Sequence, residues 1–310
     1  MTLQQLRYLC EIVDCGLSIS KAAEQLHVSQ PGISKILKSL ETELGFEILV
    51  RRGNRMIELT AAGREVVATA RNILSETRNL KAIAADRVDL KSGSLRVATT
   101  HLQARYALLD VIQKFALRYP AVDLHLIQGS MKEIARLVLE GNADIGVCAA
   151  PSRIPDDMVA LDAYPIERCV IAPANHPLLA LRKSTIRDLA KYPLITYDDT
   201  NNAGVIALQE FRKHDLEPRI SMTATDANVI KAYVTAGLGI AVLQRMAIEP
   251  RTDRGIRILS KTHAFPASMT SLIFRRGQYL RGYTYELIRM ISPRLTREAM
   301  DKAIRRLKKD

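Results

Sequence analysis

Residues 29–38 (SQPGISKILK) carry side chains that suit contacts with nucleic-acid bases and phosphates. Apolar residues recur there at three- and four-residue steps, which predicts a helix with one buried face. The opposite face is left with amide, hydroxyl and ammonium groups, which match base edges and phosphates in a major groove. The residues expected to contact double-stranded DNA from this helix are Ser29, Gln30, Pro31, Ser34, Lys35 and Lys38.

Three arginines crowd a turn that follows this helix. In residues 47–63 (EILVRRGNRMIELTAAG), two short apolar stretches flank Gly53-Asn54, a pair typical of a hairpin turn. Arg51, Arg52 and Arg55 stand at the tip. A cationic hairpin beside a presented helix indicates a winged helix-turn-helix, whose wing can touch the sugar-phosphate backbone or the minor groove.

The polar side chains of the DNA-contacting helix must be positioned by residues 17–44. The pattern of these residues predicts two helices joined by a turn at His27 and Val28. Ser29 can cap the second helix, and Pro31 is tolerated in its first turn because the amide it lacks would have no partner there. An ordinary helical hairpin with a solvated polar face is the alternative, and the cationic hairpin argues against it.

A long helix is expected after the hairpin, from Ala61 to about Arg87. Its apolar stripe alternates four- and three-residue steps, as in a two-stranded coiled coil. Pairing with a second copy would place two recognition helices on a two-fold-related DNA site. The alternative is that the stripe packs on its own chain. The stripe consists of Val66, Ala70, Ile73, Thr77, Leu80 and Ala84.

A second group of polar residues follows two predicted strands, in the segments 99–106 (TTHLQARY) and 198–204 (DDTNNAG). In open α/β sheets, ligands bind beyond the carboxyl ends of the strands. Two facing turns of this kind could hold a small anion by hydrogen bonds, without a neutralising arginine. Helix capping by the same residues is the alternative. The polar residues concerned are Thr99, Thr100, His101, Gln103, Thr200, Asn202 and Gly204.

Strands alternate with helices after a polar linker at 89–94, which predicts mostly parallel sheets with helices on both faces. The repetition favours two α/β lobes joined by crossing strands, so the fold class is α/β. The predicted domains are a winged helix-turn-helix over 1–60, a linker helix for dimerisation over 61–90, an effector-binding domain over 91–293, and a basic tail over 294–310. Lobe I of the effector-binding domain is expected at 91–164 and 267–293, and lobe II at 165–266. The tail is expected to be a short basic helix or frayed, and a solvated charge run is the favoured interpretation.

Composition narrows the class of protein further. The net charge is +12, but most of the excess lies after residue 90, so DNA binding must depend on the local placement of cations. A basic second part also suits a small anionic ligand. The four cysteines lack metal-ligand spacing and are expected as reduced thiols. Without a signal pattern or an apolar stretch of about 18 residues, a cytoplasmic protein with no membrane contact is expected.

Motifs for catalysis are not found in the sequence: there is no nucleophile elbow, phosphate-binding loop, dinucleotide glycine pattern or metal-spaced histidine or cysteine. The acid pairs Asp156-Asp157 and Asp198-Asp199 are typical of turns or helix starts. We therefore expect no enzyme and no cofactor. An anion-binding solute receptor would explain the lobes, but the N-terminal DNA module argues against it.

Residues 1–63 resemble the DNA-binding domain of the LysR-type transcriptional regulators. The resemblance lies in LQQLRYL (3–9), AAEQLHVSQPGISKILKSLETELG (22–45), RR (51–52) and LTAAG (59–63). It implies a regulator that binds promoter DNA as a homodimer or homotetramer, with a two-lobed effector domain like that of periplasmic binding proteins. RNA polymerase is then an expected partner.

Later segments resemble one branch of this family, the cysteine-regulon activators; they include TTHLQARYAL (99–108), GNAD (141–144) and residues 223–242. The branch implies control of sulfur-assimilation genes in response to acetylserine, sulfate or related sulfur metabolites. Thr100 and Gln103 stand where the branch binds its anion, and His101 is expected to support the site without contacting the anion. The branch has hydroxyl residues at three positions that are Leu102, Ala149 and Asn202 here, which should change the anion that fits.

Overall fold

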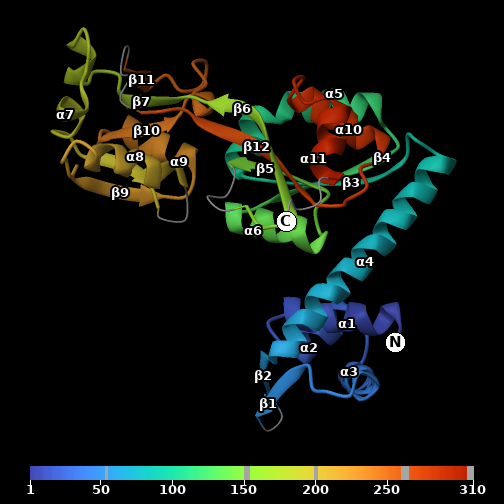
Figure 1. Cartoon of the computed structure of the whole chain (residues 1–310). Helices are drawn as coiled ribbons and strands as arrows, with labels where there is room; N and C mark the ends of the chain where they lie inside the picture. The colour runs from blue at the N-terminus through green and yellow to red at the C-terminus, as the bar shows by residue number, and fades with distance from the viewer. Residues whose placement is uncertain (53–54, 150–153, 199–201, 260–264, 306–310) are drawn as a thin grey trace. The chain divides into compact units, whose positions relative to one another are not determined.

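The computed structural model of the chain describes residues 1–52, 55–149, 154–198, 202–259 and 265–305 (Figure 1). The chain divides into two compact units, Met1–Val88 and Asp89–Asp310, and each is described by itself. The predicted Gly53-Asn54 turn and Thr200 lie outside the described residues.

The first unit begins with three helices, α1 (Leu3–Asp14), α2 (Ile19–Gln25) and α3 (Gln30–Leu44). Each starts after a residue whose hydroxyl oxygen accepts a hydrogen bond from a backbone amide of the first turn: Thr2, Ser18 and Ser29. The predicted helix pair and its turn are confirmed, and His27 in that turn has a φ of 53°. Helix α3 ends at Leu44 and is followed by the capping residue Gly45, whose φ of 79° is one that glycine adopts without steric cost.

One core holds the three helices together. The residues of α3 that recur at three- and four-residue steps face inward, and Ile33, Leu37 and Leu40 pack with Leu9 and Ile12 of α1. The chain then forms the hairpin of β1 (Leu49–Arg52) and β2 (Arg55–Leu59), which pair antiparallel with Arg52 opposite Arg55. The predicted order of helix, turn, helix and hairpin is therefore present.

Helix α4 (Ala61–Val88) differs between its two halves. In the first half, Ala70 is buried against α1 and Arg71 forms an ion pair with Asp14. In the second half, Leu80 is 68% exposed and Val88 is 89% exposed. The alternative that the apolar stripe packs on its own chain therefore applies only to the first half of α4.

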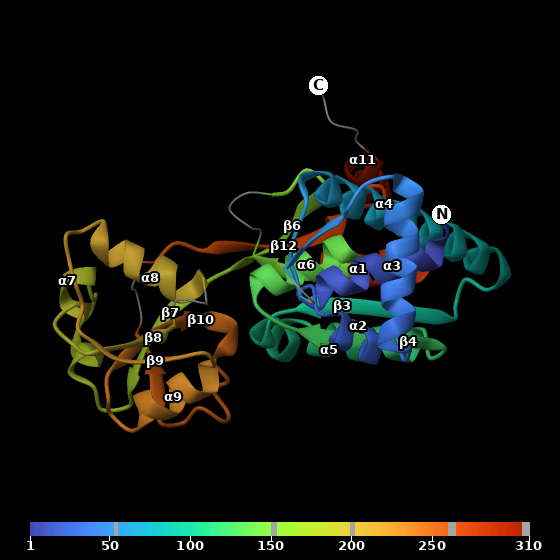
Figure 2. The ribbon, with the colours of Figure 1, turned by 90° about the horizontal axis from the view of Figure 1, so that it is seen from below.

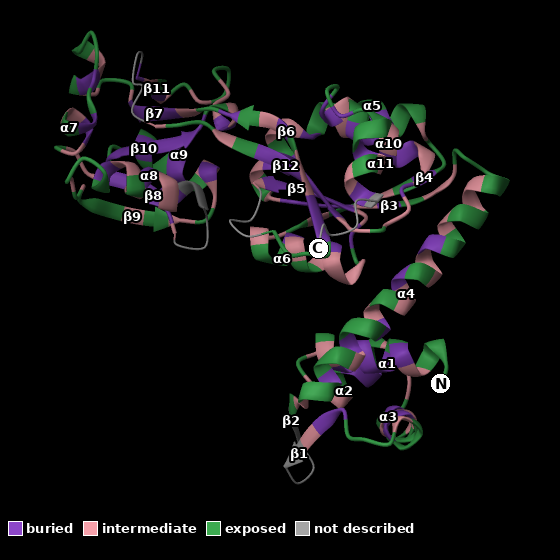
Figure 3. Cartoon of the chain, viewed as in Figure 1, coloured by how far each residue is buried: buried purple, intermediate pink, exposed green. Residues whose placement is uncertain are grey.

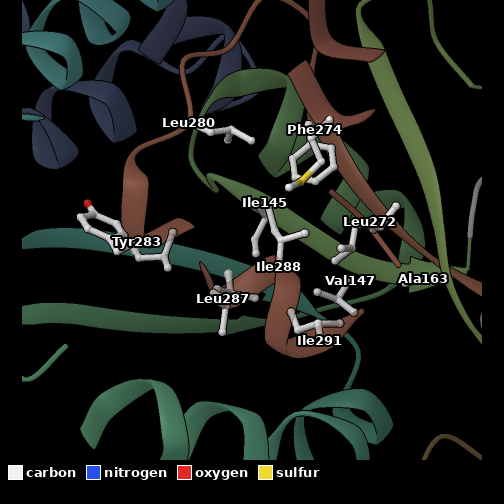
Figure 4. Close-up of a cluster of buried hydrophobic side chains, with 14 of the residues drawn as sticks. Ile145, Val147, Ala163, Leu272, Phe274, Leu280, Tyr283, Leu287, Ile288 and Ile291 are labelled. Atoms are coloured by element: carbon white, nitrogen blue, oxygen red, sulfur yellow. The ribbon is translucent and has the colours of Figure 1, made fainter. Parts of the chain in front are cut away.

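Lobe I of the second unit is built on a five-stranded sheet with the order β4-β3-β5-β12-β6. Alternate residues of its strands point to opposite faces. One face packs on α5, α10 and α11, where Phe274 and Val147 meet Leu287 and Ile288 (Figure 4). The other face packs on α6 through Ile134. The elements are β3 (Gly93–Thr99), η1 (Gln103–Ala107), α5 (Leu109–Arg118), β4 (Val122–Gln128), α6 (Met131–Glu140), β5 (Ile145–Ala149), β6 (Met158–Ile166), β12 (Ser268–Arg275), α10 (Gly282–Ile291) and α11 (Arg297–Arg305).

Lobe II repeats this plan with the strand order β11-β7-β10-β8-β9. Helix α9 covers one face through Ile230, and α7 and α8 cover the other through Leu189 and Phe211. The central strands β5, β10 and β12 are mostly buried (Figure 3). The elements are β7 (Arg168–Pro173), η2 (Pro177–Ala180), α7 (Ile186–Leu189), β8 (Leu194–Tyr197), α8 (Asn202–Arg212), β9 (Ile220–Ala224), α9 (Ala227–Thr235), β10 (Ile240–Gln244), η3 (Arg245–Ala247) and β11 (Ile256–Ile258).

Two connections run between the lobes, from β6 to β7 and from β11 to β12 (Figure 2). The predicted two-lobed α/β fold is confirmed, but "mostly parallel" is wrong. The strands that flank these connections pair antiparallel with their neighbours. The antiparallel pairs are β5·β12 and β12·β6 in lobe I, and β10·β7 and β11·β7 in lobe II.

The C-terminal segment contains a short helix, as one of the two expectations had it, but this helix is not a solvated charge run on all sides. Helix α11 buries Met300 and Ile304 in the core of lobe I. Its charged residues alternate with these apolar ones at helical spacing, so one face is buried and the other is solvated.

Candidate functional site

The expected DNA-contacting face of α3 is open to solvent. Ser29, Gln30, Pro31, Lys35 and Lys38 are exposed, and Ser34 is half-buried. The Ser29 hydroxyl oxygen accepts a hydrogen bond from the Gly32 amide (3.3 Å), so that the helix start is fixed. The structure thus gathers all six residues on one solvent-facing side of α3 and at its N-terminal end.

A buried carboxylate attaches the wing to α3, and the sequence patterns do not indicate it. Glu41 lies near the end of α3 and is buried; its Oε1 accepts hydrogen bonds from the amides of Ile48 (3.0 Å) and Leu49 (3.3 Å). Because Leu49 begins β1 and Ile48 directly precedes it, the carboxylate fixes the direction in which the hairpin leaves the helix. The side chains of Arg51, Arg52 and Arg55 lie outside the described residues, and only their backbone pairing is known.

Gly63 permits a close approach at the start of α4. A Cβ at this position would lie 2.1 Å from the backbone carbonyl oxygen of Ile48. Thr60 supports the same approach, since its hydroxyl donates to the Glu47 carbonyl (2.9 Å) and accepts from the Gly63 amide (2.8 Å). The LTAAG segment therefore connects the wing to the long helix.

A cavity of about 390 Å³ lies in the second unit, lined by residues of both lobes. Its size falls in the range of about 300–1,000 Å³ that is usual for small-molecule sites. Lobe I contributes the end of β3 and η1, and lobe II contributes the ends of β8 and β10 and the start of α9. Ligand binding beyond the ends of parallel strands is the arrangement expected from the sequence.

Four of the predicted effector-binding residues line this cavity: Thr100, Leu102, Gln103 and Ala149. Thr99 does not line it, because its side chain is fully buried and its hydroxyl donates to the Val147 carbonyl (2.8 Å). Thr200 is outside the described residues, as is the side chain of Asn202 at the start of α8. His101 is exposed and lines the cavity.

The side-chain amide of Gln103 is held by two neighbours. Its Nε2 donates to the Thr270 hydroxyl (2.9 Å), and its Oε1 accepts from the Tyr164 hydroxyl. Burial raises the pKa of Tyr164 to about 12, so this hydroxyl stays protonated and remains a donor. Gln103 lies in a single π-helical turn, a feature that is frequent at functional sites.

Lobe II supplies cavity residues that are not among the predicted effector-binding residues. Tyr197 and Gln244 are buried side by side, with the Tyr197 hydroxyl donating to Gln244 Oε1 (3.1 Å). Their positions at the ends of β8 and β10 follow the same strand-end rule that indicates Thr100. Arg105 and Arg168 also line the cavity, so two cationic side chains lie in the same lining as the predicted hydrogen-bonding residues.

Tyr106 of η1 reaches from lobe I into lobe II. Its hydroxyl donates to Asn228 Oδ1 (2.9 Å) and lies 3.4 Å from the buried ammonium of Lys231. Lys231 is held in turn by an ion pair with Asp253 (2.9 Å) and by the Ala247 carbonyl (2.8 Å). We call this contact, formed by Tyr106, Asn228 and Lys231, the interlobe latch.

The described part of the chain offers neither a metal site nor a membrane span. Among those residues, no group of three or more histidines, cysteines or acids is placed to hold a metal ion. None of the helices described is long and apolar enough to span a bilayer. Burial raises the pKa of Cys10 to about 11 and that of Cys148 to about 12, which keeps both as thiols.

Known protein families match both units. The family "LysR substrate binding domain" matches residues 89–296, and the family "Bacterial regulatory helix-turn-helix protein, lysR family" matches residues 3–64. The second unit is similar to the cofactor-binding domain of the Cbl transcriptional regulator, with a TM-score of 0.65 and 33% identity over 69% of this chain and 93% of that one. Full-length OxyR from Pseudomonas aeruginosa shares the fold, with a TM-score of 0.72 and 22% identity over 94% of this chain and 96% of that one.

Curated relatives match nearly the whole chain. The HTH-type transcriptional regulator CysB of Burkholderia cenocepacia is 38% identical over 98% of this chain and 97% of its own length. SsuR of the same organism is 41% identical over 95% of this chain and 96% of its own length, and Cbl of Escherichia coli is 34% identical over 98% and 96%. The resemblance to LysR-type regulators of the CysB kind is confirmed. With its helix-turn-helix and its two-lobed ligand domain, the chain belongs to the LysR family of bacterial transcriptional regulators.

Proposed function

We propose that this regulator controls sulfur-assimilation genes by binding promoter DNA through residues 18–55 and a small anionic effector in the cavity of the second unit. The observation that carries the DNA role is the solvent-exposed face of α3, which combines amide, hydroxyl and ammonium groups on a helix with a fixed start. The resemblance to cysteine-regulon activators and the similarity to CysB, SsuR and Cbl support the sulfur role.

Promoter recognition requires two copies of the chain. The second half of α4 supports a homodimer, because Leu80 and Val88 expose apolar surface that a second α4 can cover. Two copies related by a two-fold axis would then present two α3 helices to inverted half-sites. RNA polymerase and a further pairing of dimers into tetramers complete the proposed assembly on the promoter.

Effector binding acts through the two lobes. A ligand that touches both walls of the cavity favours one arrangement of the lobes by the difference in its affinity for the two arrangements. That difference is the only source of free energy for a change in how dimers sit on DNA. The interlobe latch joins the lobes beside the cavity and is therefore an interaction that such a change would alter.

Substitution on α3 tests the DNA role. Ser34→Ala with Lys35→Ala should weaken specific promoter binding by about 1–3 kcal/mol for each base that the variant can no longer hydrogen-bond. The measurement is fluorescence anisotropy of a labelled promoter fragment at matched salt. Lys183→Ala, which removes an exposed lysine from the second unit, is the control and should leave affinity unchanged. Wild-type affinity in the double variant would remove α3 from the proposed interface.

A further inference from the structure

Residues 45–48 form the short connection between α3 and the hairpin, and this connection is bonded to α3 through its amides. The buried Glu41 carboxylate accepts from the amides of Ile48 (3.0 Å) and Leu49 (3.3 Å). Hydrogen bonds to a charged acceptor are stronger than neutral ones, so these two restrain the connection firmly. The side chains of Ile48 and Leu49 are fully buried in the core that α3 shares with α4.

The same connection is bonded to the start of α4 through its carbonyl groups. The Thr60 hydroxyl donates to the carbonyls of Glu47 (2.9 Å) and Ile48 (3.2 Å), and the Thr60 amide donates to the Ile48 carbonyl (3.0 Å). The hydroxyl oxygen also accepts from the Gly63 amide (2.8 Å), so Thr60 caps α4 while it holds the connection. One short piece of backbone therefore joins α3 to α4.

The helix joint, as we call Glu41, Thr60 and residues 47–49, places a carboxylate where a helix disfavours one. Glu41 lies in the last turn of α3, close to the negative end of the helix dipole. A buried carboxylate is also costly unless hydrogen bonds satisfy it. The two amides of the connection offset these costs, so the carboxylate and the connection stabilise each other in one arrangement.

A second contact makes the helix joint decisive for the direction of α4. Further along this helix, Ala70 is buried against α1, and Arg71 forms an ion pair with Asp14. Because two points fix the line of a helix axis, the joint and the contact with α1 together fix α4 relative to α3. Without the joint, α4 can pivot at the contact with α1.

A pivot at Ala70 would change the separation of the two α3 helices in a dimer. Leu80, in the exposed second half of α4, lies about 15 Å beyond Ala70 along the helix axis. A tilt of about 10° moves Leu80 by about 2.6 Å, and two-fold symmetry doubles this shift to about 5 Å. One base pair occupies only about 3.4 Å of the DNA axis. A small freedom at the joint therefore corresponds to more than one base pair of half-site spacing.

We propose that Glu41 is a positioning residue that sets the spacing of the two DNA half-sites that the dimer accepts. In this role it contacts no base, but it holds α3 at a fixed angle to the helix through which two copies pair. The exposed face of α3 selects the bases of each half-site, and the helix joint selects the distance between the half-sites. This inference rests on the proposed function, because it takes α3 as the DNA-reading helix and α4 as the dimer contact.

Binding to duplexes with different half-site spacings tests the inference. Each probe carries two inverted copies of the half-site that the full-length protein selects from a random library, with either the selected spacer or one that is two base pairs longer. The longer spacer rotates the second half-site by about 70° around the DNA axis and moves it by about 7 Å, so wild-type affinity should fall by at least about 10-fold. The ratio of the two affinities, measured by fluorescence anisotropy, is the spacing penalty.

Glu41→Ala should reduce the spacing penalty to about 3-fold or less, because α4 can then pivot without breaking charge-assisted hydrogen bonds. Glu41→Gln keeps an acceptor oxygen for the two amides and should retain most of the penalty. Glu47→Ala is the control: it removes an exposed carboxylate from the same connection, with the same change in charge, and should leave the penalty unchanged. A loss of stability alone would weaken binding to both duplexes equally and leave their ratio unchanged.

Thr60→Val is the second variant, for the case in which Glu41→Ala fails to fold. It removes the hydroxyl that holds the connection from the α4 side, and it should also reduce the spacing penalty. An unchanged penalty in the folded variants, an equal reduction in Glu47→Ala, or a wild-type protein that binds both spacings alike would overturn the inference alone. A wild-type protein that selects no half-site from the library would overturn the proposed function as well.

Discussion

Gln103 can orient an effector only while its amide is held in one direction. Tyr164 holds one end of that amide and Thr270 the other. Tyr164→Phe removes a single hydrogen bond, so anion affinity should fall by about 2- to 10-fold, the usual net value of such a bond. Isothermal titration calorimetry of the variant and the wild type measures the change in anion affinity. Tyr119→Phe is the control, because the Tyr119 hydroxyl lies away from the cavity lining. Unchanged affinity would mean that Tyr164 does not position Gln103.

Cys148 gives the fold a dependence on alkaline pH. Burial raises its pKa from 9.0 to about 12, so the folded protein retains a proton that the unfolded chain releases above pH 9. The stabilisation from this group is complete below pH 9 and is lost as the pH rises toward 12. Urea unfolding should show a fall in the free energy of unfolding above pH 9 that is shallower in Cys148→Ala. Parallel curves for the two proteins would contradict this role.

Part of the cavity lining can be predicted from the sequence, because polar residue types follow the ends of predicted strands. Thr100 and Gln103 can be predicted because a strand with a clear apolar pattern, LRVAT, precedes them. Arg168 cannot, because it follows Glu167 in the sequence and resembles one half of a surface ion pair. Its place in the cavity depends on the pairing of β12 with β6, which sets the position of Ser268 and which local pattern does not show.

At the scale of the elements, the exposed half of α4 predicts the oligomeric state. Leu80 and Ile83 are 68% and 40% exposed and lie on adjacent turns of the helix. Leu80→Glu with Ile83→Glu should place charges in a coiled-coil seam and shift the protein toward monomer. Sedimentation velocity at several concentrations measures this, with the exposed Lys81→Glu as a control on the same helix. A variant that sediments as the wild type does would show that α4 does not form the dimer interface.

The interlobe latch makes a second prediction for the elements. Tyr106→Phe removes the hydrogen bond to Asn228 (2.9 Å) and the polar interaction with Lys231. The arrangement in which the lobes touch should therefore lose about 0.5–1.5 kcal/mol of stability. Small-angle X-ray scattering should then report a larger radius of gyration for the ligand-free variant. Saturation with a tightly bound anion should reduce the difference. Identical scattering curves without ligand would contradict a holding role for Tyr106.

Elements with strong helical or alternating patterns can be predicted from the sequence, and those at the margins cannot. Strand β6 escapes prediction because it contains Pro165 and lies at the edge of its sheet, where a proline is tolerated. Helix α11 resembles a solvated charge run because only two buried residues, Met300 and Ile304, mark its inner face within a basic segment. The antiparallel strands depend on how the chain crosses between lobes, which is a property of topology and not of local sequence.

On the scale of the whole molecule, one chain combines a DNA-reading unit and a ligand-binding unit. Linkage requires that an effector which changes promoter affinity by some factor has its own affinity changed by promoter DNA by the same factor. The two units need not touch for this coupling, since the arrangement of paired chains on DNA can carry it. The proposed sulfur role therefore depends on both units responding to one anion.

Selection from a random double-stranded DNA library with the full-length protein tests the central claim most directly. The bound fraction should converge on two inverted half-sites, one for each α3 of a dimer, with a spacing of about one or more helical turns. The protein carrying Ser34→Ala and Lys35→Ala, selected in parallel, should lose that enrichment. A wild-type protein that enriches no sequence, or a double variant that enriches the same sites equally well, would contradict the account.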